Sequence, residues 1–231
     1  MESNRVAENL KQVRGEIVKA CQRADRLENS VTLVAVSKTW PAEHVMRAYE
    51  AGQRHFGENK LQELEQKRSA MPDDCVWHFI GGVQRNKVRK ICAAADWVHS
   101  ISSIKIAATF SRICQEEGTE IKGFLQTNFA REDTKQGFAE QELKEQFTEL
   151  ADLPGLQLSG LMAIPPAVGS PEESRPAFRE IVRVQKELEV QMGQDLPCIS
   201  IGMSGDYQVA IEEGATHVRV GASIFGSRSY T

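Results

Sequence analysis

The sequence has 231 residues, a formal net charge of −4 and a hydrophobic share of 41%. This length suits one domain, residues 1–231, because α/β barrels commonly reach it without dividing. The acidic balance argues against a general affinity for nucleic acid or anionic membrane, since both require a basic surface. We see no signal peptide and no apolar run of the roughly 18 residues that a membrane span needs. We therefore expect a cytoplasmic protein whose partners are small molecules.

The first predicted elements are a helix, a strand and a second helix. Apolar residues recur at helical spacing from Val6 to Ala24, with charged residues between them, which predicts an amphipathic helix. Residues 31–38 form an almost continuous apolar run rich in β-branched side chains, as in a strand of a parallel sheet that is covered on both faces. Pro41 suits the first turn of the next helix, which Gly52 ends.

The same alternation of strand and helix continues to the end of the chain. Further strands are predicted at 55–58, 76–81, 97–102, 121–129, 156–164, 198–203 and 217–225. Helices are predicted between them at 60–70, 86–95, 104–117, 141–150, 172–192 and 207–213. The pattern therefore contains eight strands, each of the first seven followed by a helix.

This alternation predicts the fold class. Strands that alternate with helices indicate parallel βαβ units, and eight of them in a chain of this length favour a single closed (β/α)8 TIM barrel with an extra N-terminal helix. An open doubly wound sheet is the alternative. In a barrel, the active site lies at the carboxyl ends of the strands, so the residues that follow each strand are the first candidates for function.

Lys38 follows the first strand and precedes a Thr-Trp-Pro turn. An amine at the mouth of an apolar barrel is partly desolvated, which favours its neutral form, and a neutral amine attacks an aldehyde to form an imine. The alternative is a lysine whose stem lines the strand end while its ammonium group reaches solvent.

Two glycine- and serine-containing turns follow the seventh and eighth strands. IGMSGD covers residues 201–206 and RVGASIFG covers residues 219–226. In barrels of this kind the turns after these strands often bind phosphate through backbone N–H groups and hydroxyls, so Ser204, Gly221 and Ser223 are candidates. The alternative is that the glycines only allow tight turns. The sequence has no Walker loop, HExxH, GxGxxG or CxxC motif, so we expect no metal site.

An imine-forming lysine and a phosphate site at one barrel mouth fit two chemistries. Pyridoxal 5′-phosphate carries an aldehyde and a phosphate on opposite sides of its ring. Sugar-phosphate aldolases require the same pair of protein features. The residues alone leave both possibilities open.

Several sequence blocks resemble one family. VAVSKT (34–39), FGEN (56–59), WHFIGGVQRNK (77–87), GLMAIPP (160–166), IGMSGD and VRVGASIFG are similar to blocks of the YggS/PROSC pyridoxal phosphate homeostasis proteins, in the same order. The blocks span nearly the full chain. The resemblance implies a fold-type III barrel like the N-terminal domain of alanine racemase, with pyridoxal phosphate as a Schiff base on Lys38.

The resemblance also implies roles for individual residues. Ser204, Gly221 and Ala222 would contact the phosphate, and Arg219 would face the pyridine nitrogen. Position 222 commonly carries a hydroxyl in this family, so here only its backbone N–H would remain, with Ser223 next in the chain. The remaining pocket residues implied by the resemblance are Asn59, His78, Asn128 and Met162.

The resemblance favours a carrier over a catalyst. An arginine at the ring nitrogen keeps that nitrogen unprotonated, which weakens the cofactor as an electron sink. Alanine racemase adds a tyrosine base from the C-terminal domain of a partner subunit, and we expect no such domain here. We therefore predict a monomeric protein for intracellular pyridoxal phosphate homeostasis and amino-acid balance, with apoenzymes as recipients of the cofactor. The alternative is an amino-acid racemase or decarboxylase whose base comes from a partner.

Overall fold

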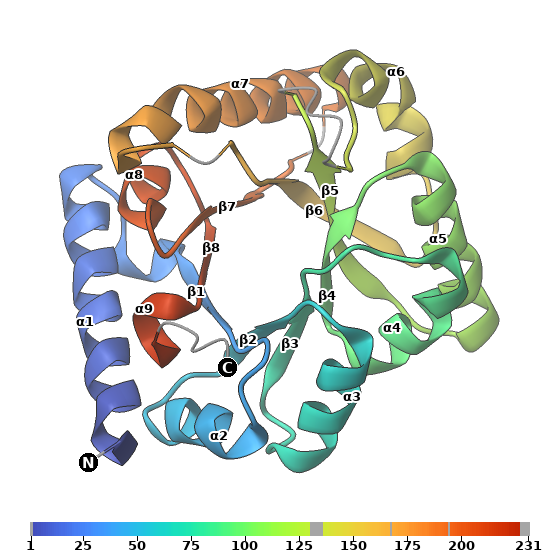
Figure 1. The fold of residues 1–231 in the computed structure, drawn as a ribbon. Coiled ribbons are helices and arrows are strands. Elements are labelled where there is room, and N and C mark those ends of the chain that lie inside the picture. Colours follow the sequence, from blue (N-terminus) through green and yellow to red (C-terminus); the bar gives the residue numbers. More distant parts are fainter. Residues whose placement is uncertain (1, 130–135, 167, 194, 227–231) are drawn as a thin grey trace.

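Eight parallel strands close into a barrel with helices around it in this computed structural model of the chain (Figure 1). The structure describes residues 2–129, 136–166, 168–193 and 195–226. The strands follow one another around the barrel in chain order, and β1 pairs with β8 to complete the ring. The predicted (β/α)8 barrel with an extra N-terminal helix is confirmed.

The elements alternate as the sequence pattern predicts. The strands are β1 Thr32–Val36, β2 His55–Glu58, β3 Val76–Phe79, β4 Trp97–Ile101, β5 Ile121–Thr127, β6 Leu156–Ala163, β7 Cys198–Met203 and β8 His217–Val220. The helices are α1 Glu2–Arg23, α2 Ala42–Glu50, α3 Leu61–Ala70, α4 Val88–Ala94, α5 Ile104–Glu117, α6 Glu140–Ala151, α7 Arg175–Met192, α8 Tyr207–Glu212 and α9 Ala222–Phe225. Short 3-10 helices cover Glu28–Ser30, Arg85–Lys87 and Pro171–Ser174.

The last predicted strand ends five residues earlier than expected. The sequence predicts a strand over residues 217–225, but β8 ends at Val220 and residues 222–225 form the short helix α9. The apolar residues of this segment suit either structure, and the chain turns away from the sheet at Gly221. A Cβ atom at Gly221 would lie 3.1 Å from the Val36 carbonyl oxygen, so this turn passes close to the end of β1. The predicted helix over 172–192 likewise begins with a 3-10 turn before α7.

The main apolar core lies between the barrel and its helices. Strand residues such as Leu33, Phe56 and Trp77 belong to one buried cluster that also contains helix residues such as Leu64 and Phe110. Because side chains alternate along a strand, the neighbouring positions point into the barrel.

Aromatic rings and histidine side chains fill part of the barrel interior. Trp97 and Phe124 stack with ring centroids 5.4 Å apart, and His99 lies 4.4 Å from Phe124. The rings of His78 and His217 contact the same group, at 5.8 and 5.3 Å from Trp97. The four strands β3, β4, β5 and β8 therefore meet across the barrel through aromatic side chains.

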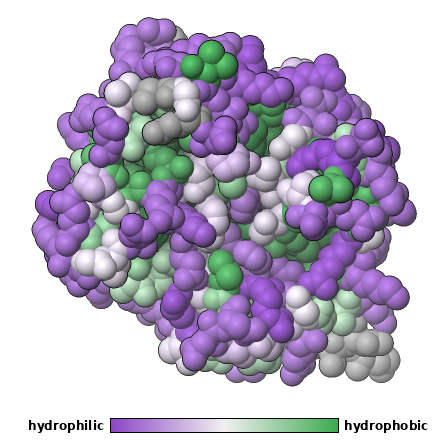
Figure 2. Space-filling model, turned by 180° about the vertical axis from the view of Figure 1, so that it is seen from behind, coloured by the Kyte–Doolittle hydropathy of each residue, from purple (hydrophilic) through white to green (hydrophobic). Residues whose placement is uncertain are grey.

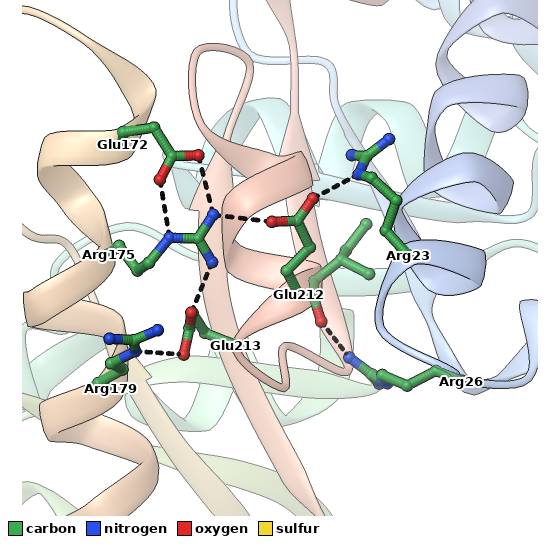
Figure 3. Close-up of polar contacts among 8 residues, drawn as sticks. Arg23, Arg26, Glu172, Arg175, Arg179, Glu212 and Glu213 are labelled. Atoms are coloured by element: carbon green, nitrogen blue, oxygen red, sulfur yellow. Dashed lines mark hydrogen bonds and ion pairs between the residues drawn. The ribbon is translucent and has the colours of Figure 1, made fainter.

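A network of charged side chains joins α1, α7 and α8 on the outside of the barrel (Figure 3). Arg175 donates to Glu212 and Glu213 at 2.8 and 2.5 Å. Arg23 of α1 donates to the other oxygen of Glu212 at 2.6 Å. Single exposed ion pairs contribute little, but several charges joined in one network contribute more. The network holds α8 in place, and α8 follows the turn after β7.

The surface seen from behind is mostly hydrophilic, with hydrophobic residues in separate small areas (Figure 2). Among the helices of the described residues, none is both long and apolar enough to span a bilayer. The barrel mouth, where the strands end, is the part of the molecule that gathers the predicted functional residues.

Candidate functional site

A cavity of about 590 Å³ opens among the carboxyl ends of the strands. Of the ten residues predicted to bind a cofactor, it is lined by Lys38, Asn59, Ser204, Arg219, Gly221 and Ala222. The other lining residues are Val36, Trp40, Ile80, Ile164, Met203, Gly205 and Gly226. The lining contains two basic side chains, those of Lys38 and Arg219, and the described residues place no carboxylate in it. The cavity is therefore suited to an anionic ligand.

The turn that carries Lys38 is firmly held. Thr39 adopts a left-handed conformation with φ of 70°, which is unfavourable for a β-branched residue. Its backbone N–H donates to Glu63 Oε2 on α3 at 2.7 Å. Trp40 then packs against Phe225 of α9, with ring centroids 6.1 Å apart. These contacts fix the chain on the far side of Lys38, so the direction in which the amine leaves the strand is set by the surrounding structure.

The turns after β7 and β8 meet at Ser204. Its hydroxyl oxygen accepts a hydrogen bond from the backbone N–H of Gly221 at 3.1 Å and a longer one from that of Ser223 at 3.5 Å. Asp206 supports the first turn, because its Oδ1 accepts from the Met203 N–H at 2.7 Å and its Oδ2 from the Ser174 hydroxyl at 3.1 Å. Backbone donors and a hydroxyl therefore converge at one wall of the cavity, as an anion site requires.

Arg219 is a buried cation at the cavity wall. Its Nη1 donates to the carbonyl oxygen and the hydroxyl of Ser200 at 2.7 and 2.6 Å, and its Nη2 donates to the Ala163 carbonyl oxygen at 2.9 Å. No carboxylate of the described residues accepts a hydrogen bond or forms an ion pair with it at these distances. Burial lowers the pKa of Arg219 to about 10, against the opposing effect of Asp206. The guanidinium therefore stays charged at neutral pH.

Four of the predicted residues lie outside the lining of this cavity. Asn128 lines a neighbouring cavity of about 280 Å³, which shares Ile164 with the first. Ser223 lines a third space, of about 390 Å³, on the other side of Ser204. His78 and Met162 are buried in the barrel wall below the mouth, with 0% and 1% of their surface exposed. Cofactor contacts by all ten predicted residues stay predictions.

A buried ion pair next to Lys38 was not anticipated from the sequence. Lys67 of α3 donates to Glu58 Oε1 at 2.5 Å and to the Ser37 carbonyl oxygen at 2.8 Å. The Ser37 hydroxyl donates to the same carboxylate oxygen at 2.6 Å. Burial raises the pKa of Glu58, although Lys67 and Ser37 act in the opposite direction. The pair joins the ends of β1 and β2 directly beneath the Lys38 turn.

The buried histidines make stability sensitive to acid. Burial lowers the pKa of His217 to about 3, and it lowers the pKa of His78 and His99 well below the ordinary value. Below pH 6.5 the unfolded chain therefore binds protons that the native protein does not. The free energy of unfolding decreases as the pH is lowered, until the native pKa is reached. For His217 alone we expect a loss of about 2 kcal/mol between pH 7 and pH 5.

Urea unfolding of the native protein and of His217→Gln at the two pH values measures this loss. The glutamine has no proton to gain, so the variant should lose about 2 kcal/mol less than the native protein over this interval. Equal losses in both proteins would contradict the prediction.

Comparison with known proteins assigns the chain to a family. The sequence model described as alanine racemase, N-terminal domain, matches residues 6–229. A pyridoxal phosphate homeostasis protein of Aquifex aeolicus is 39% identical over 96% of this chain and 98% of its own length. One from Escherichia coli is 39% identical over 99% of both chains.

Solved structures agree with this assignment. The structure of PipY from Synechococcus elongatus with pyridoxal phosphate bound has a TM-score of 0.85 and 37% identity, covering 96% of this chain and all of that one. An alanine racemase of Clostridium difficile, at 14% identity and a TM-score of 0.74, shares the fold over 97% of this chain and 58% of its own. The chain belongs to the alanine racemase N-terminal domain family and, within it, to the pyridoxal phosphate homeostasis proteins.

Proposed function

We propose that this protein binds pyridoxal 5′-phosphate on Lys38 and serves pyridoxal phosphate homeostasis and amino-acid balance as a carrier of the cofactor. The observation that carries the proposal is the single cavity in which an amine, a buried guanidinium and two glycine-serine turns face one another. The relatives named pyridoxal phosphate homeostasis protein and the pyridoxal phosphate complex of PipY support it.

The residues present suit this cofactor. The lining holds basic side chains and, among the described residues, no carboxylate, which suits a ligand that carries a phosphate. The Asn59 side-chain oxygen is buried and accepts no hydrogen bond from a described residue, so a polar ligand would give it a partner. When bound, the cofactor supplies an aldehyde for an amine and an electron-withdrawing ring.

Each lining residue has a distinct task in this proposal. Lys38 binds the aldehyde carbon, and the turn at Thr39 holds its amine toward the cavity. Ser204 and the backbone N–H groups of Gly221 and Ala222 bind the phosphate. Arg219 donates to the pyridine nitrogen and keeps it unprotonated, because a neighbouring cation disfavours a second positive charge.

Carriage is favoured over turnover because the described residues place no second base in the lining of the cavity. Tyr49 donates to Asp74 at 2.7 Å on the outside of the barrel, and Tyr207 is buried at the start of α8; neither lines the cavity. Tyr230 lies outside the described residues. A racemase or decarboxylase would need a base from a partner, and an arginine at the ring nitrogen weakens carbanion stabilisation.

Titration of the purified protein with pyridoxal phosphate tests the proposal. We expect a visible absorption band at one equivalent that borohydride abolishes. We also expect transfer of the cofactor to an added apoenzyme, and no sustained racemase or decarboxylase turnover with amino acids. Absence of the band would overturn the proposal, and sustained turnover would favour the catalytic alternative. A single domain, a monomeric state and a cytoplasmic location stay predictions, of which gel filtration tests the second.

Ser204→Ala should weaken retention of the cofactor by about 1 to 3 kcal/mol, the scale for a hydrogen bond to a charged group. Equilibrium dialysis against pyridoxal phosphate and against pyridoxal distinguishes loss of a phosphate contact from a general loss of binding, because only the first ligand carries a phosphate. The variant should lose affinity for pyridoxal phosphate and keep its affinity for pyridoxal. Ser69→Ala, on the exposed face of α3, is the matched control. Unchanged retention would mean that backbone groups alone hold the phosphate.

A further inference from the structure

A chain of hydrogen bonds runs through the barrel interior and ends on Arg219. The Ser200 hydroxyl, which accepts from Arg219, lies 2.8 Å from His99 Nδ1. His99 Nε2 lies 2.8 Å from His78 Nδ1, and His78 Nε2 lies 3.0 Å from His55 Nδ1. Ser200, His99 and His78 are buried completely, and His55 at the start of β2 is half-buried. The chain therefore links β2, β3, β4 and β7 to the cation at the cavity wall.

The direction of every hydrogen bond in the chain follows from Arg219. A guanidinium only donates, so the Ser200 oxygen accepts from it. The Ser200 hydroxyl then has its own hydrogen to place, and within the described structure the acceptor within reach is His99 Nδ1. A neutral imidazole that accepts at Nδ1 carries its proton at Nε2, so His99 donates to His78. By the same rule His78 donates to His55.

Burial, together with the nearby charges, keeps the histidines of this hydrogen-bonded chain neutral. Burial is the main reason why the pKa values of His78 and His99 lie well below the ordinary range, and the nearby His55, His217 and Arg219 act in the same direction. A protonated imidazole has no acceptor nitrogen, so it would break the sequence of donors and acceptors. Neutral histidines satisfy every link and leave Arg219 as the cation of the barrel interior.

We propose that Ser200, His99, His78 and His55 act as a positioning chain for Arg219, holding its guanidinium in the orientation in which it meets the ring nitrogen of the bound cofactor. The inference rests on the proposed function of the cavity and adds four residues to it. Among the described residues, the hydrogen-bond partners of Arg219 are carbonyl and hydroxyl oxygens and include no carboxylate. The Ser200 hydroxyl is one of three such partners, and His99 sets the direction of that hydroxyl.

Two variants of the chain and one matched control test the proposal. Ser200→Ala removes the hydroxyl and keeps the carbonyl partner of Arg219, whereas His99→Gln interrupts the chain one step further away. His217→Gln is the control, because His217 packs against the same rings but hydrogen-bonds to Thr216 outside the chain. Each protein is titrated with pyridoxal phosphate and with pyridoxal, and the visible band of its complex is followed against pH.

We expect Ser200→Ala to weaken binding of both ligands by about tenfold, the lower end of the range for a bond to a charged group, because one of three partners is lost. His99→Gln should have a smaller effect in the same direction. In both variants the pH-dependent change of the visible band should shift to a higher pH. The reason is that a poorly held guanidinium opposes protonation of the pyridine nitrogen less. The His217→Gln complex should keep the native affinity and pH profile, whatever its melting temperature.

Nitrogen NMR of the histidines in the native protein provides a measurement that needs no variant. The assignment requires His99 and His78 to be neutral with the proton on Nε2, so a proton on Nδ1 of either would overturn the proposal. Equal effects of all three substitutions on binding would overturn it too, because they would reflect core packing alone. A native protein without the visible band would instead contradict the proposed function.

Discussion

Replacing Lys38 by alanine is expected to abolish the adduct that borohydride traps between the protein and pyridoxal phosphate. The substitution removes the amine that lines the cavity and leaves the phosphate turns in place. The half-buried side chain follows the end of β1, so the free energy of unfolding should change by no more than about 1 kcal/mol. Mass spectrometry after reduction, with mapping of the modified peptide, measures the result.

The control for this experiment is a second lysine close to the mouth. Lys60 follows Asn59 and is largely exposed, so Lys60→Ala should form the adduct normally. Mapping also distinguishes Lys38 from Lys67, whose Nζ lies 2.8 Å from the Ser37 carbonyl oxygen. A modified Lys67, or an adduct that survives in Lys38→Ala, would show that the aldehyde binds elsewhere.

Lys67→Met is expected to reduce the free energy of unfolding by about 3 to 5 kcal/mol at pH 7, the range for breaking a buried ion pair. The variant leaves the Glu58 carboxylate buried with the Ser37 hydroxyl as its remaining short partner. One oxygen of this carboxylate already has no hydrogen-bond partner among the described residues. Urea unfolding followed by circular dichroism gives the loss.

The pH dependence and a double variant identify the cause of that loss. Without Lys67 the native pKa of Glu58 rises further above its unfolded value, so the penalty is present at neutral pH and shrinks as pH falls toward the ordinary carboxyl pKa of about 4.3. Glu58→Gln combined with Lys67→Met removes both charges and should recover most of the stability. A loss below about 1 kcal/mol in the single variant would mean that water reaches the carboxylate.

The residues at the barrel mouth could be predicted because they follow a rule of the fold. Parallel strands bring their carboxyl ends together, so Lys38, Ser204 and Gly221 could be placed in one group although they are far apart in sequence. The prediction that residues 222–225 belong to the last strand was wrong, because apolar residues such as Ile224 and Phe225 suit a short helix equally well. The residue types of a segment do not determine the position at which the chain leaves the sheet.

The interior contacts could not be predicted from the sequence. His55, His78, His99 and Ser200 come from four different strands, and nothing in any one of these segments links its residue to the other three. Their contact depends on the register of the strands, such as Gly57 beside His78 and Ser200 beside His217. Register is set by the packing of the whole barrel, which a single sequence does not display. The Glu58–Lys67 pair could not be predicted because it depends on how α3 packs against the end of β2.

Closure of the barrel by β1 and β8 bears on how the protein matures. Val34 lies beside Arg219 in this pairing, so the strand that leads to the lysine is synthesised well before the strand that closes the barrel beside it. A growing polypeptide on the ribosome therefore contains Lys38 before it contains the turns that we propose as the phosphate site. In the proposed function, tight binding of the cofactor therefore requires β8 to be inserted beside β1, so retention of the cofactor would report that the barrel has closed.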